Sequence, residues 1–222
     1  SLSPGAFAAT KATCTPAHLT GSGIQNSYTT PSGLFLKKVF IQKMTHECQL
    51  EWADQTAPKT LAIPVPLILT KLLDYDIPQV ENFQTLSAET VVSAEVITTS
   101  ETPVGEKWRF RLKSRVKVIP SPDFFDVLSE ASADGYAGTK IQPIAGGSPG
   151  SERVKFIQFR IRADRINNAL VKVRFETMSA VDISGFAAGI AFKLFQGGSN
   201  EDALKKFDLA TLKQTQRIGD AL

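Results

Sequence analysis

The stretch that decides the fold runs from residue 107 to residue 119 and reads KWRFRLKSRVKVI. Basic side chains occupy its odd positions up to residue 117, and the even positions are apolar apart from Ser114. Because successive side chains of a β-strand point to opposite faces, this period of two predicts a strand with one basic face and one core face. The basic residues are Lys107, Arg109, Arg111, Lys113, Arg115 and Lys117.

Two antiparallel hairpins follow from the runs around this strand. Residues 88–100 are rich in β-branched side chains, and a short link containing Gly105 joins them to residues 107–119. Residues 153–163 and 170–178 form a second such pair, turning near Asn167 and Asn168, a residue type that tolerates the left-handed backbone of tight turns. Along both strands of this pair, the side chains that alternate with the apolar core residues point to the same side as the basic face. They add four cations to it: Arg160, Arg162, Lys172 and Arg174.

The remaining elements complete a mainly β fold. Residues 33–52 predict one long strand or two, with Met44–Trp52 alternating cleanly. Short helices are predicted at 67–73, from Ser121 to about residue 131, and after a cap at Ser199 or Asn200, whereas 135–150 reads as a loop and 189–196 as a strand or a helix. With seven or eight strands and no alternation of strands and helices, we predict an antiparallel sandwich or barrel, a jelly roll among the options.

The domain organisation is predicted as an arm followed by one domain. Residues 1–33 carry a single charge, Lys11, together with eleven Ser or Thr and no periodicity, so we expect an extended arm that lies on its own domain or on a neighbouring copy. Residues 34–222 are predicted to form a single β-rich domain that ends in a helix. No apolar run is long enough to cross a bilayer as a helix, and no membrane partner is predicted.

Charge is concentrated in the middle of the chain. Residues 101–180 hold 14 basic and 9 acidic residues, a net charge of +5, against an overall net charge of +3. Neighbouring like charges on one sheet face repel each other, so something must offset them. The phosphate backbone of a nucleic acid, acidic protein surface and solvent are the three alternatives, and a register pairing odd with odd positions would place Glu95 opposite Lys113.

Catalytic apparatus is sparse in the sequence. His46 and Cys48 share the apolar face of one strand, which favours a hydrogen-bonded core histidine over a catalytic pair. The match to G-x-S-x-G around Ser148 lacks the strand before it and the helix after it that a nucleophile elbow needs, and no His follows it. Carboxylate pairs such as Asp74 with Asp76 and Asp123 with Asp126 equally fit turn or capping chemistry. We therefore predict no enzyme, no cofactor and no metal site.

These observations lead to three hypotheses. The first is a non-enzymatic, nucleic-acid-associated structural protein, such as a coat or shell subunit, that contacts the phosphate backbone through the ten cations named above and forms homo-oligomers through its arm. The second is a homo-oligomeric scaffold whose basic face is neutralised by acidic protein, and the third is an enzyme of unknown class. An intracellular or virion-associated location is favoured, and the sequence leaves open whether Cys14 and Cys48 pair.

Overall fold

The computed structural model describes residues 10–53, 57–61, 63–64, 67–68, 80–86, 89–101, 107–145, 151–185 and 200–222. Within these ranges the side chains of residues 10, 80–86, 89–101, 107–109, 120, 200 and 203 are outside the description. The predicted helix at 67–73 and the predicted element at 189–196 therefore lie wholly or mostly outside the described residues.

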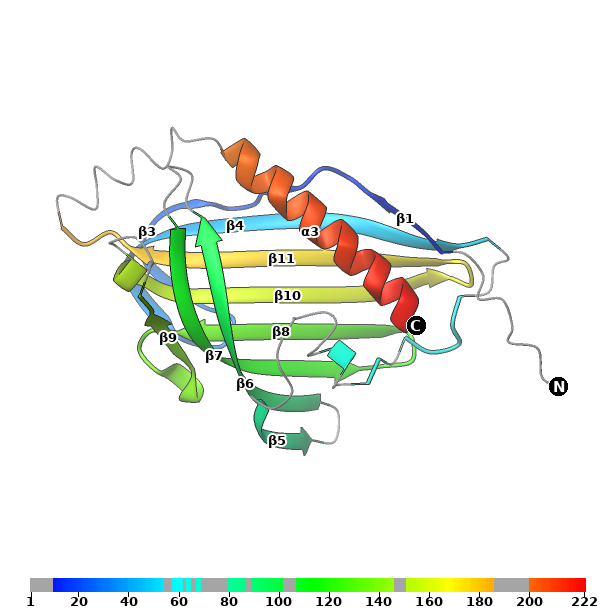
Figure 1. Ribbon diagram of the computed structural model, residues 1–222, viewed down its shortest axis with the longest axis horizontal. Coiled ribbons are helices and arrows are strands. Elements are labelled where there is room, and N and C mark those ends of the chain that lie inside the picture. The colour runs from blue at the N-terminus through cyan, green and yellow to red at the C-terminus, as the bar shows by residue number, and fades with distance from the viewer. Residues whose placement is uncertain are drawn as a thin grey trace.

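A single antiparallel sheet forms the body of the molecule (Figure 1). Its strands are β1 (Thr10–Cys14), β2 (His18–Leu19), β3 (Gly23–Thr29), β4 (Phe35–Trp52), β5 (Val80–Leu86), β6 (Glu89–Glu101), β7 (Lys107–Pro120), β8 (Phe124–Ser132), β9 (Lys140–Pro143), β10 (Val154–Asn167) and β11 (Leu170–Asp182). Two 3₁₀ turns, η3 (Tyr136–Gly138) and η4 (Ser151–Arg153), flank β9, and the helix α3 (Asn200–Ala221) ends the chain.

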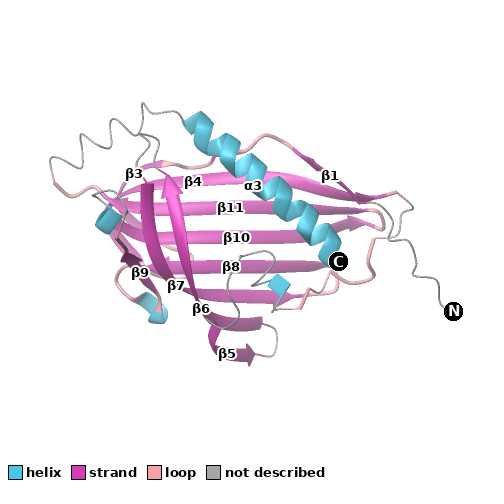
Figure 2. Ribbon diagram, in the orientation of Figure 1, coloured by secondary structure: helices cyan, strands magenta, loops and turns pink. Residues whose placement is uncertain are grey.

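The order of strands is β1-β4-β11-β10-β8-β7-β6-β5, with β2 and β3 also paired to β4 and β9 paired to β7. Figure 2 shows α3 drawn diagonally across the long central strands, with β6 and β7 bending away at one end. In the described part of the chain no pairing joins the end strands β1 and β5, so the sheet is open. The mainly antiparallel β class is confirmed, whereas the described strands form one open sheet and not the predicted sandwich or barrel.

The alternation of apolar and polar residues correctly predicted the long strands. Residues 35–52 form one continuous strand, and both predicted hairpins are present as β6 with β7 and β10 with β11. In the first hairpin, Glu95 is the register partner of Lys113 and Val91 that of Lys117, so odd positions pair with odd positions. Of the two registers considered from the sequence, the hairpin therefore has the one that places the backbone of Glu95 opposite that of Lys113.

The helix predicted after Ser121 is wrong, because residues 124–132 form the strand β8 between β7 and β10. The Ser-Pro-Asp sequence makes a tight turn in which the Ser121 N–H donates to the carbonyl oxygen of Phe124. Pro favours the second position of a turn as much as the first position of a helix, so the local signal serves both structures. Phe125 and Val127 are buried on the face shared with β10, and that burial selects the strand.

The arm is part of the sheet of its own chain. From Thr10 onward its described residues form β1, β2 and β3, each hydrogen-bonded to β4. This placement is the alternative in which the arm lies on its own domain, and a link through the arm to a neighbouring copy is not retained. A boundary at residue 33 stays a prediction. The loop predicted over 135–150 contains η3 and β9 in its described part.

Candidate ligand-binding face and disulfide cluster

The sheet has two chemically different faces. The face that α3 packs against, here called the helix face, carries His46, Phe175, Ile161 and Val127, which the pairing register places in line. The opposite side, here called the outer face, carries the basic positions that the sequence predicted. Of the residues on β7, Arg111 is exposed and Lys113, Arg115 and Lys117 are half-buried, whereas the side chains of Lys107 and Arg109 lie outside the description.

The cations of the second hairpin are matched by carboxylates of the same molecule. The Arg160 guanidinium donates from Nε to Oδ1 of Asp126 at 2.8 Å and from Nη2 to Oδ2 of the same carboxylate. These contacts raise the pKa of Arg160, chiefly through the hydrogen bond to Asp126. Arg162 donates to both oxygens of Asp164 at 2.8–3.0 Å and lies 3.5 Å from Asp126. One buried carboxylate therefore bridges two guanidinium groups.

The two remaining cations of this hairpin are paired in the same way. Lys172 Nζ lies 3.0 Å from Oε1 of Glu47, and Arg174 Nη2 lies 2.9 Å from Oε1 of Glu176. Sequence reasoning could have found Glu176, which stands two positions after Arg174 and so shares its face. It could have found Asp164 after Arg162 by the same rule.

Acidic charge also lies beside the first hairpin. Glu130 is the register partner of Arg115 and is buried. Burial raises the pKa of this carboxyl, while a hydrogen bond from Ser32 and the charges of Arg115 and Lys117 act in the opposite direction. The four cations of the second hairpin are thus paired with carboxylates of the same chain, and one buried carboxyl of the chain lies beside the first hairpin.

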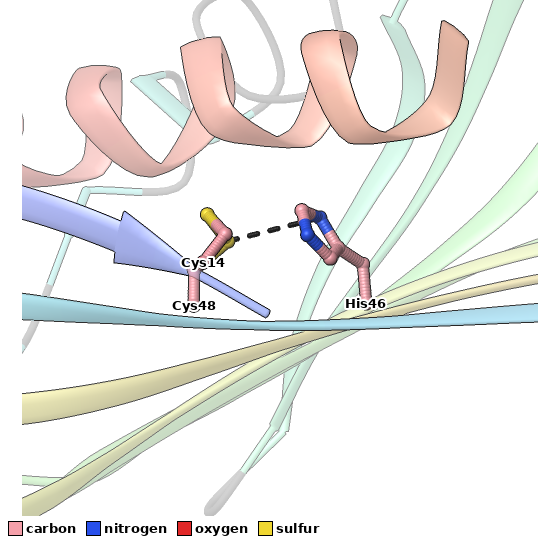
Figure 3. Close-up of side chains that lie close together, drawn as sticks. All are labelled: Cys14, His46 and Cys48. Atoms are coloured by element: carbon pink, nitrogen blue, oxygen red, sulfur yellow. Dashed lines mark hydrogen bonds between the residues drawn. A yellow bond between two sulfur atoms is a disulfide. The ribbon is translucent and has the colours of Figure 1, made fainter. Parts of the chain in front are cut away.

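On the helix face, a disulfide joins β1 to β4 between Cys14 and Cys48, as Figure 3 shows. His46 lies beside it: its Nδ1 is 3.7 Å from the Cys48 sulfur and is hydrogen-bonded to the hydroxyl of Thr211 on α3. Its Nε2 lies 3.2 Å from Oδ1 of Asp208. His46 is 1% exposed, which confirms a hydrogen-bonded core histidine. The pairing of the cysteines, left open by the sequence, is settled in favour of a bridge.

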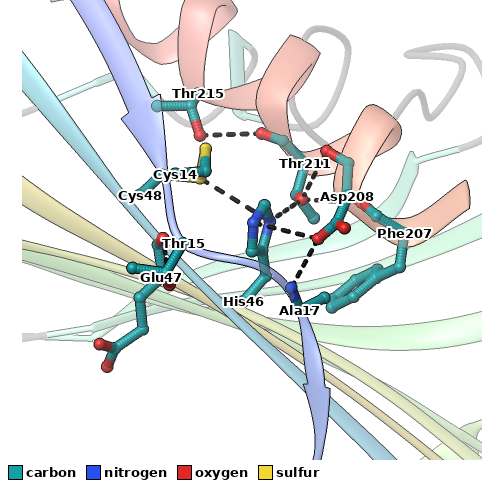
Figure 4. The surroundings of a disulfide bond; sticks show 10 residues. All are labelled: Cys14, Thr15, Ala17, His46, Glu47, Cys48, Phe207, Asp208, Thr211 and Thr215. Carbon is teal, nitrogen blue, oxygen red and sulfur yellow. Dashed lines mark hydrogen bonds and ion pairs between the residues drawn. A yellow bond between two sulfur atoms is a disulfide. The ribbon is translucent and has the colours of Figure 1, made fainter. Parts of the chain in front are cut away.

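The helix contributes the polar half of this cluster (Figure 4). The Thr211 hydroxyl donates to the carbonyl oxygen of Phe207 at 2.7 Å, and Asp208 accepts the Ala17 N–H at 2.7 Å. Asp208 therefore ties the segment after β1, the strand β4 and α3 together. No sequence pattern links His46 to Asp208 and Thr211, because the contact exists only once α3 has packed on the sheet.

Buried apolar side chains of the helix face form two separate clusters. The first contains Cys48, Phe175 and Ile161, and it includes Phe207 and Ile218 of α3. The second lies at the far end around Phe110, Leu112, Ala131, Ile141 and Val154. Among the described residues, those of α3 that join a buried cluster all join the first one.

A band of half-buried residues separates the two clusters. The register aligns Ser129, Phe159, Thr177 and Met44 in one row across β8, β10, β11 and β4, and aligns Ile157 with Ser179 in the next row. Phe159, Thr177 and Met44 are half-buried, in contrast to the full burial of Phe175 and Ile161 one row away. This band, here called the central band, combines apolar surface with small hydroxyl groups.

Comparison with known proteins gives little similarity. No family model and no curated protein sequence matches the chain. Among solved structures, human STARD10 is similar with a TM-score of 0.37 and 8% identity, over 89% of this chain and 73% of that chain. The lipid transfer and protein localization domain of human StarD13 (DLC2) is similar with a TM-score of 0.26 and 11% identity, over 90% of this chain and 88% of that chain. TM-scores at this level do not establish a shared fold.

The predicted nucleic-acid-associated coat or shell protein is corrected by these findings. The described cations of the second hairpin are ion-paired within the chain, and the described arm belongs to its own sheet. No helix among the described residues is long and apolar enough to cross a membrane. Nucleic acid, another polyanion and an arm-linked neighbour are therefore withdrawn as partners.

Proposed function

We propose that the chain is a non-enzymatic binding domain that holds a small apolar or amphipathic molecule on the central band of the helix face. The observation that carries the proposal is the interruption of the apolar core. Phe159 and Met44 pack against the first cluster, Ile157 and Val181 pack against the second, and all four remain only half-buried. An apolar molecule seated there would remove this surface from water and join the two clusters.

The polar side chains of the band suit an amphipathic molecule. Ser129 is buried and Thr177 is half-buried on either side of Phe159, and Ser179 is half-buried opposite Ile157. Small-molecule sites are typically lined by apolar side chains with a few hydroxyl or amide groups that orient the ligand. Hydroxyl groups donate and accept, so they bind a carbonyl, hydroxyl or carboxyl head without requiring a charge.

A binding titration with the full chain tests this proposal. The probe is a fluorescent fatty acid, and native mass spectrometry gives the number of molecules bound and shows whether they are recovered unchanged. We expect one saturable site, weakened at least about tenfold by Phe159→Glu because a carboxylate in the band opposes apolar contact. Leu209→Glu, at a position 64% exposed on α3, is the matched control and should bind as the unmodified chain does.

A second variant separates loss of binding from loss of folding. Thr177→Phe fills the band without adding charge, and far-UV circular dichroism with thermal melting verifies that each variant is folded. A folded Thr177→Phe chain should bind the probe at least about tenfold more weakly, because the added ring occupies the space of the ligand. Absence of saturable binding by the unmodified chain, or unchanged binding by both band variants, contradicts the proposal.

A further inference from the structure

Cys14, His46 and Cys48 place three potential metal-ligand atoms within 4.8 Å of one another. Two of these atoms, the Cys48 sulfur and His46 Nδ1, are 3.7 Å apart. A tetrahedral zinc ion with Zn–S of about 2.3 Å and Zn–N of about 2.0–2.1 Å needs its sulfur and nitrogen ligands about 3.5–3.6 Å apart. The existing separation is therefore already close to that of two ligands on one ion.

We propose that reduction of the Cys14–Cys48 disulfide converts this cluster into a binding site for a divalent zinc ion, with Cys14, Cys48 and His46 as ligands. In the oxidised chain the two sulfurs are bonded to each other and neither can act as a thiolate ligand. Separating them to the roughly 3.8 Å expected of two zinc-bound sulfurs requires rotation of the two cysteine side chains.

The electron and proton balance of the conversion is simple. A dithiol reductant transfers two electrons, so that its own two thiols become a disulfide while the Cys14–Cys48 bond breaks to give two thiols. Zinc then displaces one proton from each thiol as the two Zn–S bonds form, and two protons pass to solvent. Cys14 is half-buried whereas Cys48 is 1% exposed, so the reductant and the ion approach from the side of Cys14.

The residues around His46 form a second shell suited to this role. Asp208 Oδ1 lies 3.2 Å from Nε2, so a His46 that binds the ion through Nδ1 can donate its Nε2 proton to this carboxylate. Asp208 is itself fixed by the Ala17 N–H, which donates to it at 2.7 Å. Thr211, which is hydrogen-bonded to Nδ1 in the oxidised chain, releases this contact when the ion binds, and a water molecule completes the tetrahedron.

Cobalt titration of the full chain tests the proposal, because cobalt(II) reports thiolate ligation through a charge-transfer absorption band. The chain is reduced with a phosphine, desalted without oxygen and titrated with cobalt alone, then with zinc as a competitor. We expect one equivalent of cobalt to give the thiolate band, zinc to abolish it, and the oxidised chain to show no band. A reduced chain without the band, or an equal band in the oxidised chain, overturns the proposal.

Variants distinguish zinc binding at the proposed three-ligand site from zinc binding by the two cysteine thiols alone. His46→Gln should weaken zinc binding at least tenfold, and Asp208→Asn should weaken it about 10–100-fold as expected of a second-shell carboxylate. Asp220→Asn, exposed near the end of the same helix, is the matched control and should leave the affinity unchanged. Equal affinity in all four chains overturns the proposed ligand set.

Thermal melting covers the case in which reduction weakens the fold. Zinc that binds only the folded state raises the melting temperature of the reduced chain in a concentration-dependent way. We expect that rise in the reduced chain and none in the oxidised chain. A reduced chain that gains neither the cobalt band nor thermal stability contradicts the inference, whatever its folded fraction.

Discussion

Replacing Asp126 by Asn removes the negative charge that two arginines of the outer face share. The Asp126 side chain is 8% exposed and receives two hydrogen bonds from Arg160, whose side chain is 39% exposed. Exposed ion pairs contribute about 0–1 kcal/mol, and removing one partner of a buried pair costs about 3–5 kcal/mol. This pair is intermediate in burial, so Asp126→Asn should lower the free energy of unfolding by about 2 kcal/mol.

A double-mutant cycle with Arg160→Met isolates the pair. The methionine keeps the packing of the aliphatic stem, and the cycle should return a coupling energy of about 1 kcal/mol. Urea denaturation at neutral pH, followed by circular dichroism in low and high salt, measures each corner. Arg111→Met, at an exposed position on the same face, should change stability by less than about 0.5 kcal/mol and serves as the control. An Asp126→Asn chain as stable as the unmodified one would show that the outer face is not internally neutralised.

Three further predictions concern other parts of the fold. The double variant Cys14→Ser with Cys48→Ser removes a bridge across 34 positions, and equilibrium unfolding should show a loss of about 3–4 kcal/mol. Glu130→Gln removes a carboxyl whose pKa is raised in the folded chain above its ordinary value of 4.5. The unmodified chain gains stability from the protonated carboxyl below the unfolded pKa and loses that stability as the pH rises through the folded pKa. The glutamine variant has no such loss. Its free energy of unfolding relative to that of the unmodified chain should therefore increase from pH 4 to neutral pH in denaturant titrations. A constant difference would contradict this. Gly33→Ala places a methyl group 3.2 Å from the Tyr136 hydroxyl at a backbone φ of +94°, and should lower the melting temperature in calorimetry by an amount equivalent to about 1–3 kcal/mol. An unchanged melting temperature would count against strain at this turn.

Period-two patterning located the long strands and sorted the two faces of β10 and β11 around Ile161 and Phe175, but not at the end where Phe156, Met178 and Ala180 are buried on the opposite face. In β10 and β11 the apolar phase of Ile161 and Phe175 faces the core as predicted, because a sheet with one packed face must alternate along each strand. The C-terminal helix beginning at Asn200 could also be predicted, since a capping residue and the acidic Glu201 and Asp202 in the first turn are local signals.

The incorrect prediction of nucleic-acid binding followed from the incorrect prediction of a helix over residues 121–131. Because residues 121–131 were predicted to be helical, the predicted sheet lacked Asp126, whose carboxylate bridges Arg160 and Arg162 in the structure. The choice between helix and strand there depends on burial between β7 and β10, which is a tertiary property that a short window of sequence does not contain. A charged face can be assessed only after every strand that contributes to it is assigned.

The disulfide cluster was beyond sequence reasoning for a different reason. Asp208 and Thr211 lie on the last helix, far along the chain from His46, and neither belongs to a spacing typical of metal or catalytic sites. Only the crossing of α3 over β1 and β4 brings them together (Figure 4).

The position of β4 has a consequence for how the chain is made. This strand pairs along one edge with β1, β2 and β3, which are synthesised just before it, but its other edge pairs with β11, with Glu51 opposite Leu170. During translation that second edge stays without its native partner until β11 has left the ribosome. A nascent chain of this topology presents an 18-residue strand edge to other strands and to chaperones, and its folding should be slow because the pairing that completes the sheet is also the one of longest range.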